Sequence, residues 1–192
     1  MTRWINSIGW LFCVVYATIP CFWLLVHPRA GYWRSQRYSP YLILLPLWLM
    51  MWIVTGFVSS YWRHATLYTA SWTWAPAIAL FVVGVRIYSL SGQHFSLTQL
   101  GGLPEVLPQH GEQRLVTTGI RSRVRHPIYL AHLCEMLAWS LGTGLAVCYG
   151  LTFFAMLTGA LMIRMEDREL KQRFGDAYRE YRRKVAAILP RI

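Results

Sequence analysis

Residues 127–163 decide the fold. They read PIYLAHLCEMLAWSLGTGLAVCYGLTFFAMLTGALMI and carry one charge, on Glu135. As a single helix this stretch would extend about 55 Å, almost twice the roughly 30 Å hydrocarbon core of a bilayer. Gly142-Thr143-Gly144 supplies a turn inside it. We therefore expect a helical hairpin with arms at about 128–141 and 145–164, both crossing the membrane.

Three further apolar stretches precede this hairpin. Each is long enough to cross a bilayer as a helix, at about 8–26, 41–62 and 65–86. Arg3 precedes the first, as in a signal peptide, but no small-x-small cleavage pattern follows, so we interpret it as a signal-anchor helix. The sequence predicts an all-α integral membrane protein with five transmembrane helices in a single domain over 1–192.

The composition supports this class. Only 14% of the residues are charged and 55% are hydrophobic, whereas soluble domains carry about 25% charged residues. Four cysteines lie in apolar runs without a CxxC pair, so buried free thiols are expected and a metal site is not. They are Cys13, Cys21, Cys134 and Cys148.

The basic residues predict the orientation. With five spans, 16 of the 19 lysines and arginines fall on one side of the membrane. Cytoplasmic loops carry the excess of Lys and Arg. We therefore expect a multi-pass membrane protein with its N-terminus outside and its C-terminus in the cytoplasm.

The C-terminal segment has its own pattern. Phe174, Tyr178, Tyr181 and Val185 recur at helical spacing with basic residues between them, and Gly175 can end the preceding helix. The pattern is typical of a cytoplasmic amphipathic helix on a membrane surface. Aromatic residues among arginines also occur in nucleic-acid binders, but five spans favour the bilayer as partner, and no nucleic acid is expected.

The hairpin begins at His126-Pro127, where proline suits the first helical turn. Free N–H groups at this helix start, flanked by Arg121 and Arg125, would favour an anion such as a cofactor carboxylate. The alternative is that these arginines face lipid phosphates.

Acidic residues stand at the exit of the last span. Glu166 and Asp167 lie on the strongly basic side, where they could bind a cationic group. The alternative is a salt-bridge ladder on a solvated helix, for example with Lys171.

A stripe on the first hairpin arm joins Tyr129 to His132, Glu135 and Trp139. Ionisable residues within a span are functional candidates, here for contact with a substrate. The alternative is a His132–Glu135 pair satisfied by its neighbours. A strand-linked GxGxxG, a Walker sequence and an HExxH sequence are all absent from the chain.

These motifs together resemble a known family. Leu115-Val116-x-x-Gly119, Arg125-His126-Pro127-x-Tyr129, the apolar hairpin, Glu166-Asp167 and Phe174-Gly175-x-x-Tyr178-x-x-Tyr181 follow one another in order. The set, over roughly 86–190, is similar to the isoprenylcysteine carboxyl methyltransferase family and to the related phospholipid N-methyltransferases.

The resemblance implies an S-adenosylmethionine-dependent methyltransferase whose acceptor is a lipophilic molecule in the membrane. It implies a cytoplasmic cofactor pocket built from about 93–129 and 164–190. Leu115 and Val116 would lie along the cofactor, His126, Pro127, Ile128 and Tyr129 would wrap it, and Glu166 would contact it. Arg121 and Arg125 complete the expected binding set.

The chain departs from that pattern at the substrate end. Prenylcysteine methyltransferases have an arginine for the substrate carboxylate where this chain has Met162. Arg164 is close in sequence, but two residues rotate it by about 200° around a helix. We expect Glu166, Arg164 and Asp167 to be the catalytic candidates, while the acceptor stays open.

Two other functions remain as alternatives. Membrane sterol reductases and related ene-reductases share a similar C-terminal half and use NADPH, but they typically have Asn where this chain has Ile128. A non-enzymatic membrane scaffold would explain the spans without explaining the ordered motifs.

Overall fold

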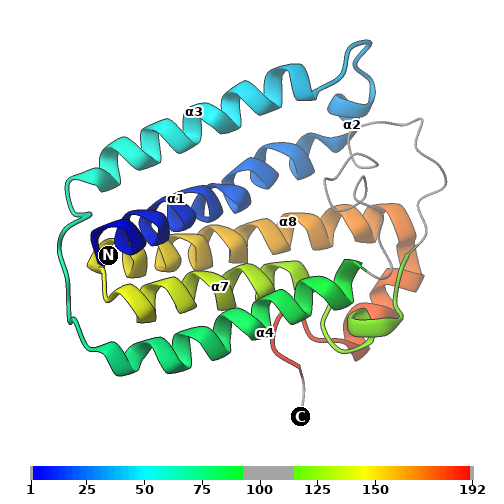
Figure 1. Ribbon diagram of the computed structural model, residues 1–192. Coiled ribbons are helices and arrows are strands. Elements are labelled where there is room, and N and C mark those ends of the chain that lie inside the picture. The colour runs from blue at the N-terminus through cyan, green and yellow to red at the C-terminus, as the bar shows by residue number, and fades with distance from the viewer. Residues whose placement is uncertain (1, 93–114, 191–192) are drawn as a thin grey trace.

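The computed structural model describes residues 2–92 and 115–190 of the chain, and within these ranges its regular structure is helical. The long helices are α1 (Thr2–Val26), α3 (Tyr41–Ser60), α4 (Trp74–Gly92), α7 (Pro127–Thr143) and α8 (Ala146–Lys184). The short ones are η1 (His27–Arg29), α2 (Ala30–Arg34), η2 (Ser71–Thr73) and η3 (Gly119–Ser122). Figure 1 shows the long helices lying side by side.

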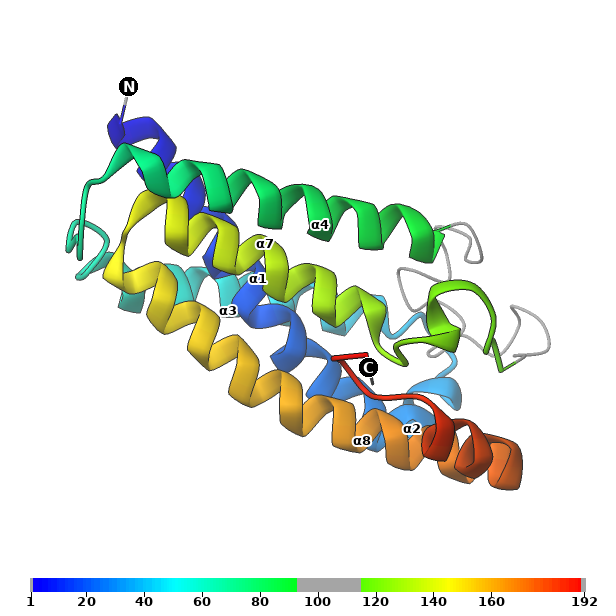
Figure 2. The same cartoon turned by 90° about the horizontal axis from the view of Figure 1, so that it is seen from below.

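The bundle is centred on α1, α7 and α8, with α3 along α1 at one edge and α4 along α7 at the other (Figures 1 and 2). Its core lies where α1 meets α7 and α8, because small buried residues such as Cys13, Ala17 and Cys148 let these helices approach closely. Larger side chains fill the remaining space around them. They include Trp10, Val14, Met136, Leu145 and Leu151.

The outer surfaces of the bundle are apolar, as lipid contact requires. On α3, Leu42, Ile53 and Phe57 are each more than 60% exposed. Four helical stretches are long and apolar enough to cross a membrane: Arg3–Trp33, Tyr41–Ser60, Ser71–Gly92 and Ala146–Lys184. This confirms an all-helical fold over the described residues, with helices long and apolar enough for an integral membrane protein. With 17 residues, α7 is about 26 Å long, so its crossing as a fifth span stays a prediction.

The expected third span, 65–86, is displaced along the chain. The structure starts this helix at η2 and α4 and continues it to Gly92, past Arg86. Residues 65–70 are not helical because their backbone pairs with the hairpin turn: Leu67 N–H donates to Gly144 O at 2.8 Å, and Ala146 N–H donates to Ala65 O at 2.9 Å. Long-range backbone hydrogen bonds thus hold residues 65–70 in a non-helical conformation despite their apolar sequence.

The hairpin between α7 and α8 turns at the predicted position. Gly144 ends α7 with a φ of 65°, in the left-handed region that favours glycine. A Cβ atom there would lie 2.3 Å from the carbonyl oxygen of Tyr68. Glycine is therefore required at this position both by the backbone conformation and by the close approach of the 65–70 segment.

Helix α8 has 39 residues and is broken at Gly175. The part before the break, 146–174, is about 43 Å long, so only its apolar residues 146–163 fit a bilayer. Its charged remainder, 164–184, extends beyond. Gly175, with φ 55° and ψ −126°, interrupts it as expected. The aromatic residues that follow do not form the predicted free membrane-facing surface, since Tyr178, Tyr181 and Val185 are buried in a small core with Leu115.

One end of the bundle brings the polar segments together. The end of α1, the end of α4, the start of α7 and the charged part of α8 all lie at the right in Figure 1. We call this the site end, defined by His27, Gly92, Pro127 and Glu166. The compartment that it faces stays a prediction.

Candidate active site

The site end is organised around His126, which precedes the first turn of α7. Its Nδ1 lies 3.2 Å from Oε2 of Glu166, and its Nε2 lies 3.1 Å from Oδ1 of Asp167. Burial alone would lower the pKa of His126, but the two carboxylates outweigh it and raise the pKa to about 9. At neutral pH, His126 is therefore an imidazolium held between two carboxylates.

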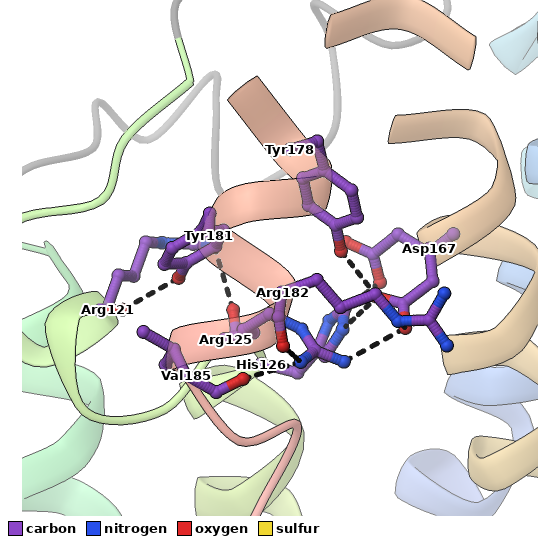
Figure 3. Close-up of polar contacts among 9 residues, drawn as sticks. Arg121, Arg125, His126, Asp167, Tyr178, Tyr181, Arg182 and Val185 are labelled. Carbon is purple, nitrogen blue, oxygen red and sulfur yellow. Dashed lines mark hydrogen bonds and ion pairs between the residues drawn. The ribbon is translucent and has the colours of Figure 1, made fainter. Parts of the chain in front are cut away.

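Asp167 is the most heavily bonded of these groups (Figure 3). It is 5% exposed and accepts hydrogen bonds from Arg125 Nη2 at 3.0 Å, from His126 and from the Tyr178 hydroxyl. Arg182 Nε lies 3.3 Å away. Burial favours the neutral acid, but these donors outweigh it and lower the pKa of Asp167 to about 2. Asp167 therefore joins the two parts of α8 to the start of α7.

Backbone pairing fixes the C-terminal segment against the same place. Arg125 N–H donates to Ala186 O at 2.9 Å and His126 N–H donates to Ala187 O at 3.0 Å. The Arg125 side chain also donates to Val185 O at 2.6 Å. Since this guanidinium is bonded to Asp167 and Val185, the structure uses Arg125 to fasten the C-terminal segment, and its predicted cofactor contact gains no support.

The Tyr181 hydroxyl makes the matching connection to η3. It donates to Arg121 O at 2.7 Å, and Arg121 Nη1 donates to Arg125 O at 3.2 Å (Figure 3). These two contacts connect η3 to the C-terminal segment and to Arg125, just before the helix start that was predicted to bind an anion. Leu115 packs on the Tyr178 and Tyr181 core, beside this loop as the resemblance implied.

Glu166 differs from Asp167. Its Oε2 atom is buried and makes no hydrogen bond within the described residues, although His126 lies within ion-pair distance. Burial would raise the pKa of this carboxyl, but His126, His27 and Arg121 outweigh it and lower the pKa. Glu166 is therefore an ionised carboxylate with spare hydrogen-bonding capacity, which suits a ligand with a cationic group.

His27 and Glu169 are functional candidates that the sequence reasoning missed. His27 Nδ1 lies 2.7 Å from Oε2 of Glu169, which joins η1 to α8 three residues after Glu166. The signal was present, because His27 is an ionisable residue at the exit of an apolar span. Its partner, 142 positions later, could not be identified without the fold.

The predicted stripe from Tyr129 to Trp139 lies farther along α7, inside the bundle. The His132 ring is surrounded by Tyr16, Tyr88 and Tyr129, with ring centroids 4.8, 5.3 and 6.2 Å away. Glu135 is 4% exposed. The tyrosines from α1 and α4 were not expected from the sequence, since only packing brings these helices to α7.

The remaining predicted residues divide between the two regions. Pro127 is buried at the start of α7, and Ile128, Tyr129 and Val116 are half-buried. Arg164 is exposed, whereas Met162 is fully buried. Segment 93–114 of the predicted cofactor pocket lies outside the described residues. Among residues 2–92 and 115–190, no group of three metal-ligating side chains could hold a metal ion.

Comparison with known proteins adds an independent observation. The ergosterol biosynthesis ERG4/ERG24 family matches residues 14–192. Delta(14)-sterol reductase TM7SF2 of Mus musculus is 34% identical over 84 residues, or 42% of this chain and 20% of that protein. Methanethiol S-methyltransferase 1 of Bradyrhizobium diazoefficiens is 30% identical over 109 residues, or 55% of this chain and 35% of that protein.

An uncharacterized protein of Haemophilus influenzae is 36% identical over 59 residues, which is 30% of this chain and 94% of that protein. No solved structure matches the chain. The chain spans a fifth of the matched reductase and about a third of the matched methyltransferase.

Proposed function

The chain belongs to the ergosterol biosynthesis ERG4/ERG24 family, and within that family of membrane enzymes we propose that it is an S-adenosylmethionine-dependent methyltransferase. Its acceptor is a lipophilic molecule that partitions into the membrane. Similarity to both a reductase and a methyltransferase leaves the cofactor to be argued from the site.

The Glu166 carboxylate, whose Oε2 atom is buried, carries this proposal. S-adenosylmethionine bears an ammonium, a sulfonium and a carboxylate, and when bound it supplies an electrophilic methyl group. Glu166 has an acceptor atom without a hydrogen bond among the described residues, so it fits the cationic part of such a ligand. An anionic ligand would instead bring a second negative charge to a carboxylate that has only His126 as its ion-pair partner in the part of the chain that the structure describes.

The neighbouring residues prepare this carboxylate. His126 lies beside Glu166 and keeps it ionised, while Asp167 holds His126 from the other side. The start of α7 at Pro127 carries the partial positive charge of a helix N-terminus, which suits the ligand's carboxylate. The residues therefore provide one region for positive charge and one for negative charge.

The same contacts limit which groups can move a proton. A carboxylate acceptor needs no base, whereas a thiol or an amine needs one. His126 is protonated at neutral pH and Asp167 is bonded to several donors. Neither is suited to take a proton from an acceptor, so a base for a protic acceptor must come from elsewhere in the bundle.

NADPH-dependent reduction is the second candidate. It is favoured by the family match and by the similarity to the mouse reductase. It conflicts with the site end, because NADPH carries several phosphate charges and Glu166 presents a buried carboxylate. Ile128 also occupies the position where such reductases typically have Asn.

Calorimetric titration of the detergent-purified protein with S-adenosylmethionine, and separately with NADPH, tests the proposal. We expect S-adenosylmethionine to bind and NADPH not to bind. Glu166→Gln should weaken cofactor binding about tenfold or more, because a hydrogen bond to a charged group is lost. Glu180→Gln is the matched control, since Glu180 is an exposed residue of the same helix.

Binding of NADPH alone would indicate a reductase and would contradict the proposal that Glu166 binds the cationic part of the cofactor. Failure of both cofactors to bind folded protein would overturn the proposal and favour the scaffold. If Glu166→Gln and Glu180→Gln weaken S-adenosylmethionine binding equally, the effect comes from the overall charge of α8. That result would also overturn the assignment of Glu166 as a cofactor-binding residue.

A further inference from the structure

We propose that the acceptor binds between α4 and α7, with its polar group at Glu135 and His132 and its apolar part in a cavity one turn farther from the site end. The proposal deepens the function proposed above and rests on it. It assigns the acceptor's chemical class, a small lipophilic molecule whose polar group carries a dissociable hydrogen, such as a thiol.

The polar part of this subsite is built by three helices. Glu135 and His132 come from α7, Tyr16 from α1 and Tyr88 from α4. The Tyr16 ring meets His132 edge-on at 4.8 Å, and Tyr88 lies on another side at 5.3 Å. Four side chains with polar atoms thus gather inside an apolar bundle. Polar and ionisable side chains are energetically costly inside a membrane, and within spans they usually mark functional sites.

The packing of α4 makes room for the Glu135 side chain. A Cβ atom on Gly84 would lie 2.7 Å from Cγ of Glu135 and 3.1 Å from the carbonyl oxygen of Ala131. Glycine at this position lets α4 approach α7 closely, and a larger residue would displace the Glu135 side chain or separate the helices. The carboxyl is therefore part of the interface and is not directed toward lipid.

A cavity of about 200 Å³ lies between α4 and α7 and opens at the bundle surface, where Ile78 is 60% exposed. It is lined by Trp74, Ala77, Ile78, Phe81, Ala138 and Trp139. Ala138 and Trp139 stand three and four residues after Glu135, and Phe81 stands three residues before Gly84, so the cavity is one helical turn away on both helices. An engineered apolar cavity of about 150 Å³ binds benzene, so this one can hold a short hydrocarbon chain.

The order of these features along α7 gives the acceptor a direction. His126 stands at the site end, His132 lies about 9 Å farther along the axis, Glu135 about 13 Å and Ala138 about 18 Å. A molecule with its chain in the cavity therefore points its polar group toward His132 and the site end. Methyl transfer then requires the sulfonium of the cofactor to reach the level of His132, about 9 Å from His126 along the helix axis.

The charges at this subsite select the polar group. A carboxylate would lie beside the Glu135 carboxyl, and the position where a substrate arginine is expected holds Met162, which is fully buried and apolar. A thiol or hydroxyl hydrogen can instead be donated to the imidazole of His132 or to Glu135, both of which can accept a hydrogen bond. Glu135 and His132 are thus assigned as acceptor-binding residues.

The test uses the full chain in lipid nanodiscs, titrated by calorimetry with hexanethiol or with hexanoate, and with empty nanodiscs as the blank. These probes share a hydrocarbon chain and differ in the polar group. We expect saturable binding of hexanethiol and none of hexanoate. Ala77→Leu fills the cavity and Glu135→Leu removes the polar partner, so each should weaken hexanethiol binding about tenfold.

Val82→Leu is the matched control, because Val82 is an exposed residue of α4 outside the cavity lining. Phe81→Ala provides a variant that enlarges the cavity, and it should shift the preference from hexanethiol to octanethiol. This second change keeps the test decisive if Ala77→Leu or Glu135→Leu fails to fold.

Binding of S-adenosylmethionine in the same preparations separates this inference from the proposed function. If S-adenosylmethionine binds while hexanethiol binding is absent or equal in all variants, the subsite is wrong and the methyltransferase proposal stands. If hexanethiol shows the expected pattern while S-adenosylmethionine does not bind, the subsite stands and the proposed function fails. Preferred binding of hexanoate would overturn the assigned acceptor class.

Discussion

The side chain of His27, just after the first helix, lies 2.7 Å from the carboxylate of Glu169 on the last helix. Both side chains are largely shielded from solvent, with exposures of 2% and 12%. The contact joins the N-terminal and C-terminal parts of the fold beside Glu166. The first span is therefore part of the site end as well as an anchor in the membrane.

His27→Leu should lower the thermal stability of the detergent-solubilised protein. The substitution removes the hydrogen bond to the imidazole and leaves the Glu169 carboxylate with Arg173, 3.9 Å away, and the loss of a hydrogen bond to a charged group costs about 1.5–3 kcal/mol. Unfolding followed by circular dichroism would measure the change. His64→Leu, an exposed histidine far from the site end in sequence, is the control, and equal effects of the two substitutions would contradict a specific role for His27.

Asp167→Asn should be more damaging. The substitution keeps the side-chain volume but leaves the charges of Arg125 and His126 without this anion, and breaking a buried pair costs about 3–5 kcal/mol. Asp176→Asn serves for comparison, because the Asp176 side chain is 88% exposed and such surface pairs contribute about 0–1 kcal/mol. A small effect at Asp167, measured by denaturant or thermal unfolding, would show that the network does not hold the C-terminal segment.

The stability of the protein should fall as the pH becomes alkaline. The pKa of His126 is raised from 6.5 to about 9 by Glu166 and Asp167, which outweigh its burial. Because the folded state holds this proton more tightly, the contribution is complete below about pH 6.5 and is lost as the pH rises through about 9. We expect a loss of about 3 kcal/mol over that window.

His126→Gln should flatten this dependence when melting temperatures are compared between about pH 7 and about pH 10. The pKa of Asp167 is lowered from 3.8 to about 2, so its contribution has the opposite sign. It is present above about pH 4 and is lost as the pH falls through about 2. An alkaline loss of the same size in His126→Gln would place its origin in another group.

Gly144→Ala should destabilise the turn between α7 and α8. Alanine pays about 1–2 kcal/mol in the left-handed conformation, and its Cβ atom would also lie 2.3 Å from Tyr68 O. Gly150→Ala is the matched control because Gly150 is helical and a Cβ atom there meets nothing within 4 Å. It should be neutral or slightly stabilising. If both variants melt at the same temperature, the turn is not under the constraint that we describe.

Much of the fold could be predicted from local sequence. The apolar runs predicted the helices, and Gly142-Thr143-Gly144 predicted the hairpin turn. Both predictions depend on the length and hydropathy of a segment and on its backbone sterics, which are local properties. The start of α4 was misplaced because residues 65–70 pair with Gly144 and Ala146. The aromatic residues after Gly175 were assigned to a membrane surface, since periodicity marks an apolar face without identifying what covers it.

The chain by itself determined the membrane class, the hairpin and the presence of Glu166, Asp167 and His126 as candidate residues, since these depend on residue type and spacing. The tertiary structure decided their separate roles. In the folded chain, Asp167 accepts hydrogen bonds from Arg125, His126 and Tyr178. Glu166 has a buried oxygen that makes no hydrogen bond among the described residues. Two adjacent carboxylates point in different directions from one helix, and only the elements packed around it determine which donors each one meets.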